Sequence, residues 1–228
     1  MRDPLPGLGV AFLLCAIAAG DEPGARPAPA SIDLDLKHPR VDLVWFDPSQ
    51  VLPCRPELVR REVAAIFGTI GVGVSWTIGG AGTTTGPGEL QVILLAQDRS
   101  GDSRHAMGSV LGSAGPSRAL WVVLAQVKRA LALEDLPDGA LSVSQLAQIG
   151  RAIGRVVAHE VIHAVAPGSP HAASGLMRRQ LNRGELLRHW IPLDPSSTAA
   201  FVSALGGRGG GPEPAVQISR ARTRRSVS

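Results

Sequence analysis

The sequence lacks tyrosine, has only two cysteines, and contains no apolar run long enough to span a bilayer. The apolar run from Leu8 to Gly20 instead has the length of a signal-peptide core. Residues 1–20 are therefore expected to be a signal peptide of an exported (secreted or periplasmic) protein. A lipoprotein anchored through Cys15 is disfavoured, because Leu14 stands where a small residue is wanted. Removal of the signal leaves Cys54 alone, so no intrachain disulfide is expected.

A basic stripe with interleaved aromatic residues, as in nucleic-acid interfaces, is also missing. The formal net charge is +4, and residues 205–228 alone hold five arginines and one glutamate, which accounts for the whole surplus. Residues 206–228 have too few apolar side chains to fold and are predicted to be a disordered basic tail. The charge therefore predicts no nucleic-acid partner, and the hydropathy predicts no membrane span.

The remaining chain is long enough for one domain, expected at residues 41–205 after a Pro/Ala-rich linker at 21–40. Alternation of apolar and small or polar residues predicts a strand at 72–78, and β-branched or continuous apolar runs predict strands at 41–47, 90–97 and 118–124. Apolar spacing predicts a helix beginning at Pro56, and Asp194 is a good N-cap for a short last helix. Residues 107–111 are either an edge strand or a plain loop.

A second helix is predicted from Ser142 to about Ala166, and it contains the pattern His159-Glu160-x-x-His163. Two histidines four residues apart project from the same side of a helix and can bind one tetrahedral cation, with Glu160 beside a water in the open fourth position. The apolar stripe of this helix continues onto Glu160 and His163, so both face inward. A buried carboxylate is costly unless it is paired or faces a cleft, which favours a zinc site over core histidines with a salt-bridged Glu160.

The third zinc ligand is less determined by the sequence. His171 is favoured, because it follows the Pro167-Gly168 turn that lets the chain double back. Glu185 is the rival, and it would make a site of two histidines and one glutamate; Asp194 is a more distant candidate. His189 is expected to be a surface residue.

The segment HEVIHAVAPGSPH followed by SGLM resembles the metzincin zinc peptidases, with their HExxHxxGxxH motif and downstream Met-turn, here Met177. The order of predicted elements is similar too, and small matrixin-like or archaemetzincin-like proteins are the nearest in pattern. The resemblance implies an α/β (α+β) catalytic domain with a mixed twisted sheet, a backing helix, an active-site helix and a small C-terminal lobe. The chain departs from the motif, since His171 stands eight residues after His163 rather than six. The tyrosine that some metzincins place near the Met-turn has no counterpart here.

The resulting expectation is a zinc-dependent endopeptidase that acts as a monomer on peptide or protein substrates. Zn²⁺ and Glu160 as general base would hydrolyse a peptide held by strand addition along residues 107–111. The alternatives are a non-catalytic zinc-binding or peptide-binding protein with the same fold, and a domain without metal. Glu160 favours the enzyme, because a structural zinc site needs no base beside an open position.

Overall fold

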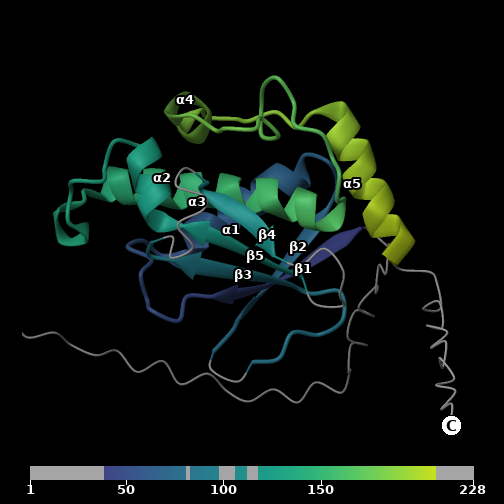
Figure 1. The fold of residues 1–228 in the computed structure, drawn as a ribbon, viewed down its shortest axis with the longest axis horizontal. Coiled ribbons are helices and arrows are strands. Elements are labelled where there is room, and N and C mark those ends of the chain that lie inside the picture. The colour runs from purple at the N-terminus through teal and green to yellow at the C-terminus, as the bar shows by residue number, and fades with distance from the viewer. Residues whose placement is uncertain (1–38, 81–82, 98–105, 112–117, 209–228) are drawn as a thin grey trace, which may run out of the picture. The chain divides into compact units, whose positions relative to one another are not determined.

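A computed structural model describes residues 39–80, 83–97, 106–111 and 118–208, all within one unit of the chain, Lys37–Ser228 (Figure 1). The predicted signal peptide at 1–20 and Cys15 lie outside the described residues, as do nearly all of the predicted linker and the tail from residue 209 onward. Those expectations stay predictions.

The described unit is built on a five-stranded mixed sheet, which confirms the predicted α/β class. Its strands are β1 (Arg40–Phe46), β2 (Gly73–Ile78), β3 (Leu90–Leu95), β4 (Gly108–Leu111) and β5 (Arg118–Val123), in the order β2-β1-β3-β5-β4. The β1–β2, β1–β3 and β3–β5 pairs are parallel, and β4 pairs antiparallel with β5. Residues 108–111 are thus an edge strand rather than a plain loop.

One face of this sheet carries the core. Alternate residues of β1, β3 and β5 point to the same side and are almost completely buried, as the period of a strand requires: Val41, Leu43, Trp45, Leu90, Val92, Leu94, Leu120 and Val122. The helices α1 (Pro56–Gly68) and α3 (Val143–Val165) lie over this face (Figure 1). Both helices were predicted.

The long helix α3 begins at a capping box in which the Ser142 hydroxyl accepts the Gln145 N–H and the Gln145 side chain accepts the Ser142 N–H. Its second half is buried on nearly every side, which agrees with its near-continuous apolar sequence. It packs closely on α1 at Gly154, where an added Cβ would lie 2.7 Å from the Glu62 Cβ and 3.0 Å from the Val59 carbonyl oxygen. This contact fixes the helix that carries the HExxH pattern.

The remaining elements are α2 (Leu124–Ala130), a 3₁₀ turn η1 (Asp138–Ala140), α4 (Arg183–Leu187) and α5 (Pro195–Arg208). The sequence predicted α5 and its cap, and the Ser197 N–H donates to Asp194 Oδ2 at 3.0 Å. It did not predict α2, η1 or α4. The helix α5 ends at Arg208, three residues beyond the predicted domain boundary at 205. None of the described helices is both long and apolar enough to cross a membrane.

Candidate metal centre

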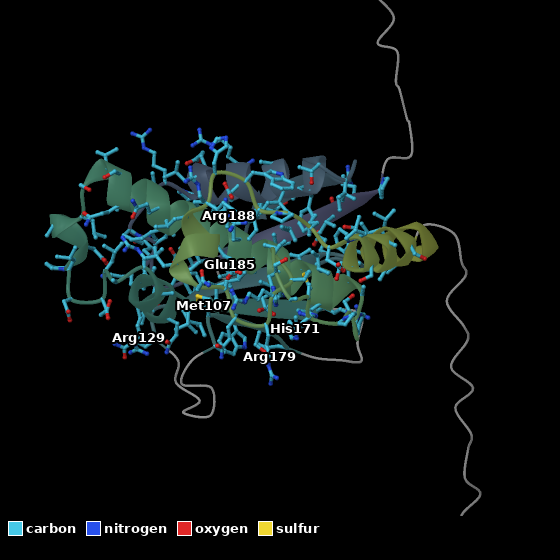
Figure 2. All side chains as sticks on the ribbon, turned by 90° about the horizontal axis from the view of Figure 1, so that it is seen from above. Met107, Arg129, His171, Arg179, Glu185 and Arg188 are labelled. Carbon is cyan, nitrogen blue, oxygen red and sulfur yellow. The ribbon has the colours of Figure 1, made fainter. Side chains whose placement is uncertain are left out.

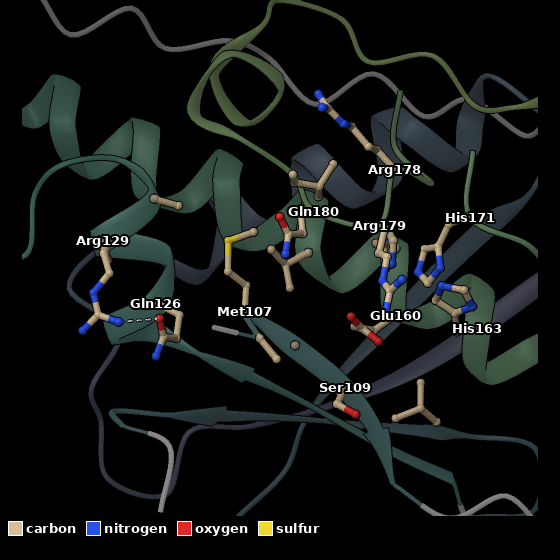
Figure 3. A pocket seen from close by; sticks show the side chains of 17 residues that line it. Met107, Ser109, Gln126, Arg129, Glu160, His163, His171, Arg178, Arg179 and Gln180 are labelled. Atoms are coloured by element: carbon tan, nitrogen blue, oxygen red, sulfur yellow. Dashed lines mark hydrogen bonds between the residues drawn. The ribbon is translucent and has the colours of Figure 1, made fainter. Parts of the chain in front are cut away.

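The centre is assembled by the last turns of α3 and by the chain that returns after it. His159 and His163 lie one turn apart on α3. The chain leaves the helix after Val165, and Gly168 takes a left-handed backbone conformation with φ of 88°. This turn brings His171 back beside His163 (Figure 3).

The three histidines form one group in which one ligand nitrogen from each lies within 4.8 Å of the others. Their ring centroids are 4.8 Å apart for His159 and His163, 4.9 Å for His163 and His171, and 5.5 Å for His159 and His171. The structure therefore brings His171 to the other two despite its departure from the usual spacing. That all three bind zinc stays a prediction.

A backbone carbonyl orients the first histidine. His159 Nδ1 lies 2.8 Å from the carbonyl oxygen of Leu176, and because a carbonyl only accepts, Nδ1 must carry the proton. His159 is then in the Nδ1–H tautomer, which leaves the lone pair of Nε2 free to bind a metal. Leu176 belongs to a turn from Gly175 to Arg178, closed by the Arg178 N–H donating to the Gly175 carbonyl at 3.2 Å. Met177, the predicted Met-turn residue, lies in this turn and is fully buried.

The donor set fits a zinc ion. The Nε2 atom of His163 is buried and has no hydrogen-bond partner within the described part of the chain, which is costly for a polar atom unless something binds there. Burial is the main cause that lowers the pKa of His159, and burial together with the neighbouring histidines lowers the pKa of His163 to about 4. Both rings are thus neutral near pH 7, and neutral imidazoles are zinc ligands.

Glu160 lies beside the histidines with its carboxylate in the cleft (Figure 3). It is 9% exposed, and no described residue donates a hydrogen bond or forms an ion pair to it. Burial raises its pKa to about 7. It contacts β4, because a Cβ added to Gly108 would lie 2.8 Å from its Cγ. An unpaired buried carboxylate beside three histidines is suited to proton transfer.

The other predicted residues lie outside this cluster. The carboxylate of Glu185 accepts from Arg178 Nη1 at 2.8 Å and from the Asn182 N–H at 2.9 Å, as part of the α4 capping box. Asp194 caps α5, and the hydrogen bond from the Ser196 hydroxyl is the first cause that lowers its pKa. His189 is exposed, as expected. The rival third ligands are therefore both engaged elsewhere.

The cluster opens into a cleft of about 750 Å³. One wall is formed by Met107 and by Gly108 to Val110 of β4, and the opposite wall includes residues 178–181, which begin at the last residue of the turn. Arg129 of α2 also lines it (Figure 3). No sequence pattern had pointed to Leu176 or Arg179 as residues of the site. The pair Arg178-Arg179 after Met177 was visible, but nothing in a run of two arginines tells which guanidinium faces a cleft.

Comparison with known proteins adds little to this geometry. No protein-family model and no curated protein sequence matches the chain. Among solved structures, the chain is similar to the crystal structure of archaemetzincin (amzA) from Methanopyrus kandleri, with 16% sequence identity and a TM-score of 0.47. The similarity covers 74% of this chain and 96% of that chain. Such a distant likeness does not place the chain in a family, so its function has to be inferred from the site itself.

Proposed function

We propose that the protein is a zinc-dependent peptidase in which His159, His163 and His171 hold the metal. The observation that carries this proposal is the convergence of three histidine nitrogens within 4.8 Å of one another, beside a carboxylate without a partner among the described residues. A purely structural zinc site is closed by four protein ligands, whereas three ligands at the wall of a cleft leave one position for reactants.

Glu160 is proposed as the general base. When bound, zinc would polarise the scissile carbonyl and acidify the attacking water. Glu160 takes the proton from this water and passes it to the nitrogen of the leaving amine. Its position in the cleft wall, adjacent in sequence to His159, keeps its carboxylate beside the proposed metal without using it as a ligand.

The substrate is proposed to be an extended peptide. The strand β4 is the last strand of the sheet, and Gly108, Ser109 and Val110 line the cleft. The backbone groups on its outer edge have no strand partner within the described residues, so a peptide can add there as a further strand. Such binding uses main-chain hydrogen bonds and suits cleavage within a chain.

Metal analysis of the purified protein tests this proposal. We expect about one zinc per chain and peptide cleavage that a chelator abolishes. His159→Ala should lose the zinc and the activity, because two remaining histidines bind zinc weakly. His189→Ala is the matched control, since this histidine is exposed and outside the cluster, and it should keep both. Stoichiometric zinc that persists in His159→Ala would contradict the assignment.

A further inference from the structure

The charged residues around the cleft are unbalanced. Among its lining residues Glu160 is the only acid, whereas three arginines contribute positive charge, Arg129, Arg178 and Arg179. A bound divalent cation would add further positive charge to the cleft. A cleft lined by one sign of charge concentrates ligands of the opposite sign.

The two neighbouring arginines differ in their surroundings. Arg178 forms an ion pair with Glu185 at 2.8 Å, so its charge is already compensated. Arg179 is exposed, and no carboxylate of the described residues lies within 4.0 Å of its guanidinium. Its side chain extends into the cleft beside His171 and toward Glu160, while that of Arg178 points away (Figure 3).

Arg129 lies at the other end of the same cleft, and its guanidinium donates to the amide oxygen of Gln126 at 2.9 Å (Figure 3). In the view from above, Arg129, Met107, Arg179 and His171 lie on the same side of Glu185, with Arg188 on the opposite side (Figure 2). Arg129 thus adds to the positive potential of the cleft, but Arg179 is the uncompensated arginine next to the proposed reaction centre.

We infer that Arg179 is a specificity residue that binds a carboxylate of the substrate close to the bond that is cut. This inference rests on the proposed peptidase function. A guanidinium matches the geometry of a carboxylate through two parallel hydrogen bonds, which makes an anionic substrate group its natural partner. The carboxylate is supplied by an aspartate or glutamate side chain or by the free C-terminus of the peptide.

The test uses peptides of one sequence in which glutamate replaces glutamine at successive positions, each made with a free and with an amidated C-terminus. Their binding to zinc-loaded Glu160→Gln protein is measured by fluorescence anisotropy, and their cleavage by the wild type is measured in parallel. We expect the best carboxylate-bearing peptide to bind roughly tenfold more tightly than its neutral counterpart. The position or terminus that carries this gain identifies the source of the carboxylate.

Four further variants, combined with Glu160→Gln for the binding assay, locate the effect. Arg179→Gln should reduce the ratio of the two affinities to about one, and Arg179→Glu should make a lysine peptide the preferred ligand. Arg183→Gln removes an exposed arginine that does not line the cleft, and it should leave the ratio unchanged. A ratio that survives in Arg179→Gln, or that falls equally in Arg129→Gln, overturns the assignment to Arg179.

The outcomes also separate this inference from the proposed function. Wild-type cleavage without any preference for a carboxylate leaves the peptidase proposal standing and overturns the specificity. Absence of cleavage, together with a carboxylate preference in binding that depends on Arg179, overturns the peptidase proposal and leaves Arg179 only as a residue that binds a peptide carboxylate.

Discussion

His171 reaches the other two histidines through local backbone geometry. Gly168 supplies the positive φ of the turn, and the Ser169 N–H donates to the Ala166 carbonyl at 3.1 Å. The Ala172 N–H then donates to the Met177 carbonyl at 2.8 Å, which ties the returning segment to the turn beneath His159. The two residues by which the chain exceeds the metzincin spacing are thus accommodated between His163 and His171.

The identity of the third ligand can be tested directly. His171→Ala should weaken zinc affinity by roughly a hundredfold or more, because it removes one of three protein ligands. Glu185→Ala should leave zinc affinity nearly unchanged, since both of its carboxylate oxygens already accept hydrogen bonds elsewhere. Competition with a chromophoric chelator measures both affinities. The reverse pattern would replace the three-histidine site by one with two histidines and a glutamate.

Gly108 controls how closely β4 approaches the base. A Cβ at this position would lie 2.8 Å from both Glu160 Cγ and Val156 Cγ1 and 3.1 Å from Glu160 Oε1. Gly108→Ala should therefore displace the Glu160 carboxylate, lower the stability by about 1–3 kcal/mol and reduce turnover, with zinc content retained. Gly139→Ala is the control, because an added Cβ there meets nothing within 4 Å. Unchanged turnover in Gly108→Ala would show that this contact does not position Glu160.

Among the elements, α4 is joined to the two core helices by one buried cation, Arg155 of α3. Its Nε donates to Glu62 Oε1 of α1 at 2.7 Å, its Nη2 donates to the Arg188 carbonyl at 2.6 Å, and its Nη1 donates to the Glu185 carbonyl. The residue is fully buried. This network holds α4, which follows the turn that contains Leu176 and the adjacent Arg179.

Arg155→Met should lower the free energy of unfolding by about 3–5 kcal/mol, because it leaves two carbonyls without a donor and removes the close partner of the Glu62 carboxylate. Arg151→Met is the matched control: its side chain is 39% exposed and its Nε lies 3.8 Å from Glu62, so its loss should cost about 1 kcal/mol or less. Urea denaturation of both variants measures the difference. A similar small cost for both would show that the buried network does not stabilise the fold.

The elements found from the sequence are those with a strong hydrophobic periodicity or with clear turn or capping residues at their ends. The strands β1, β2, β3 and β5 and the helices α1, α3 and α5 all have one or the other, whereas β4 was left open between an edge strand and a plain loop. By contrast, α2 follows β5 directly without glycine or proline, and its N-cap Val123 offers no side-chain hydrogen bond, so its first residue was assigned to the strand. With only five residues, α4 is too short to show a helical period. Its capping box, Asn182 with Glu185, was the available signal.

At the scale of the whole molecule, the cleft combines four segments that are distant in the sequence, around residues 106–110, 126–130, 156–163 and 171–181. The HExxH pattern identified the segment at 156–163 because helical spacing is local. The Leu176 carbonyl and the Arg179 side chain could not be assigned in this way, because their positions depend on how the chain after α3 packs back against it. Residues that hold or surround a site through tertiary packing leave no short-range pattern.

The proposed catalytic role of Glu160 is tested most directly by comparing zinc content and peptide turnover in the wild type and in Glu160→Gln. The substitution keeps the shape of the side chain but removes its capacity to accept a proton, so zinc should stay near one per chain while turnover falls by roughly three or more powers of ten. Both proteins are assayed at matched zinc content with a chelator control. Chelator-sensitive cleavage that survives undiminished in Glu160→Gln would contradict the mechanism, and absence of cleavage by the wild type on a mixed peptide library would favour a zinc-binding or peptide-binding protein instead.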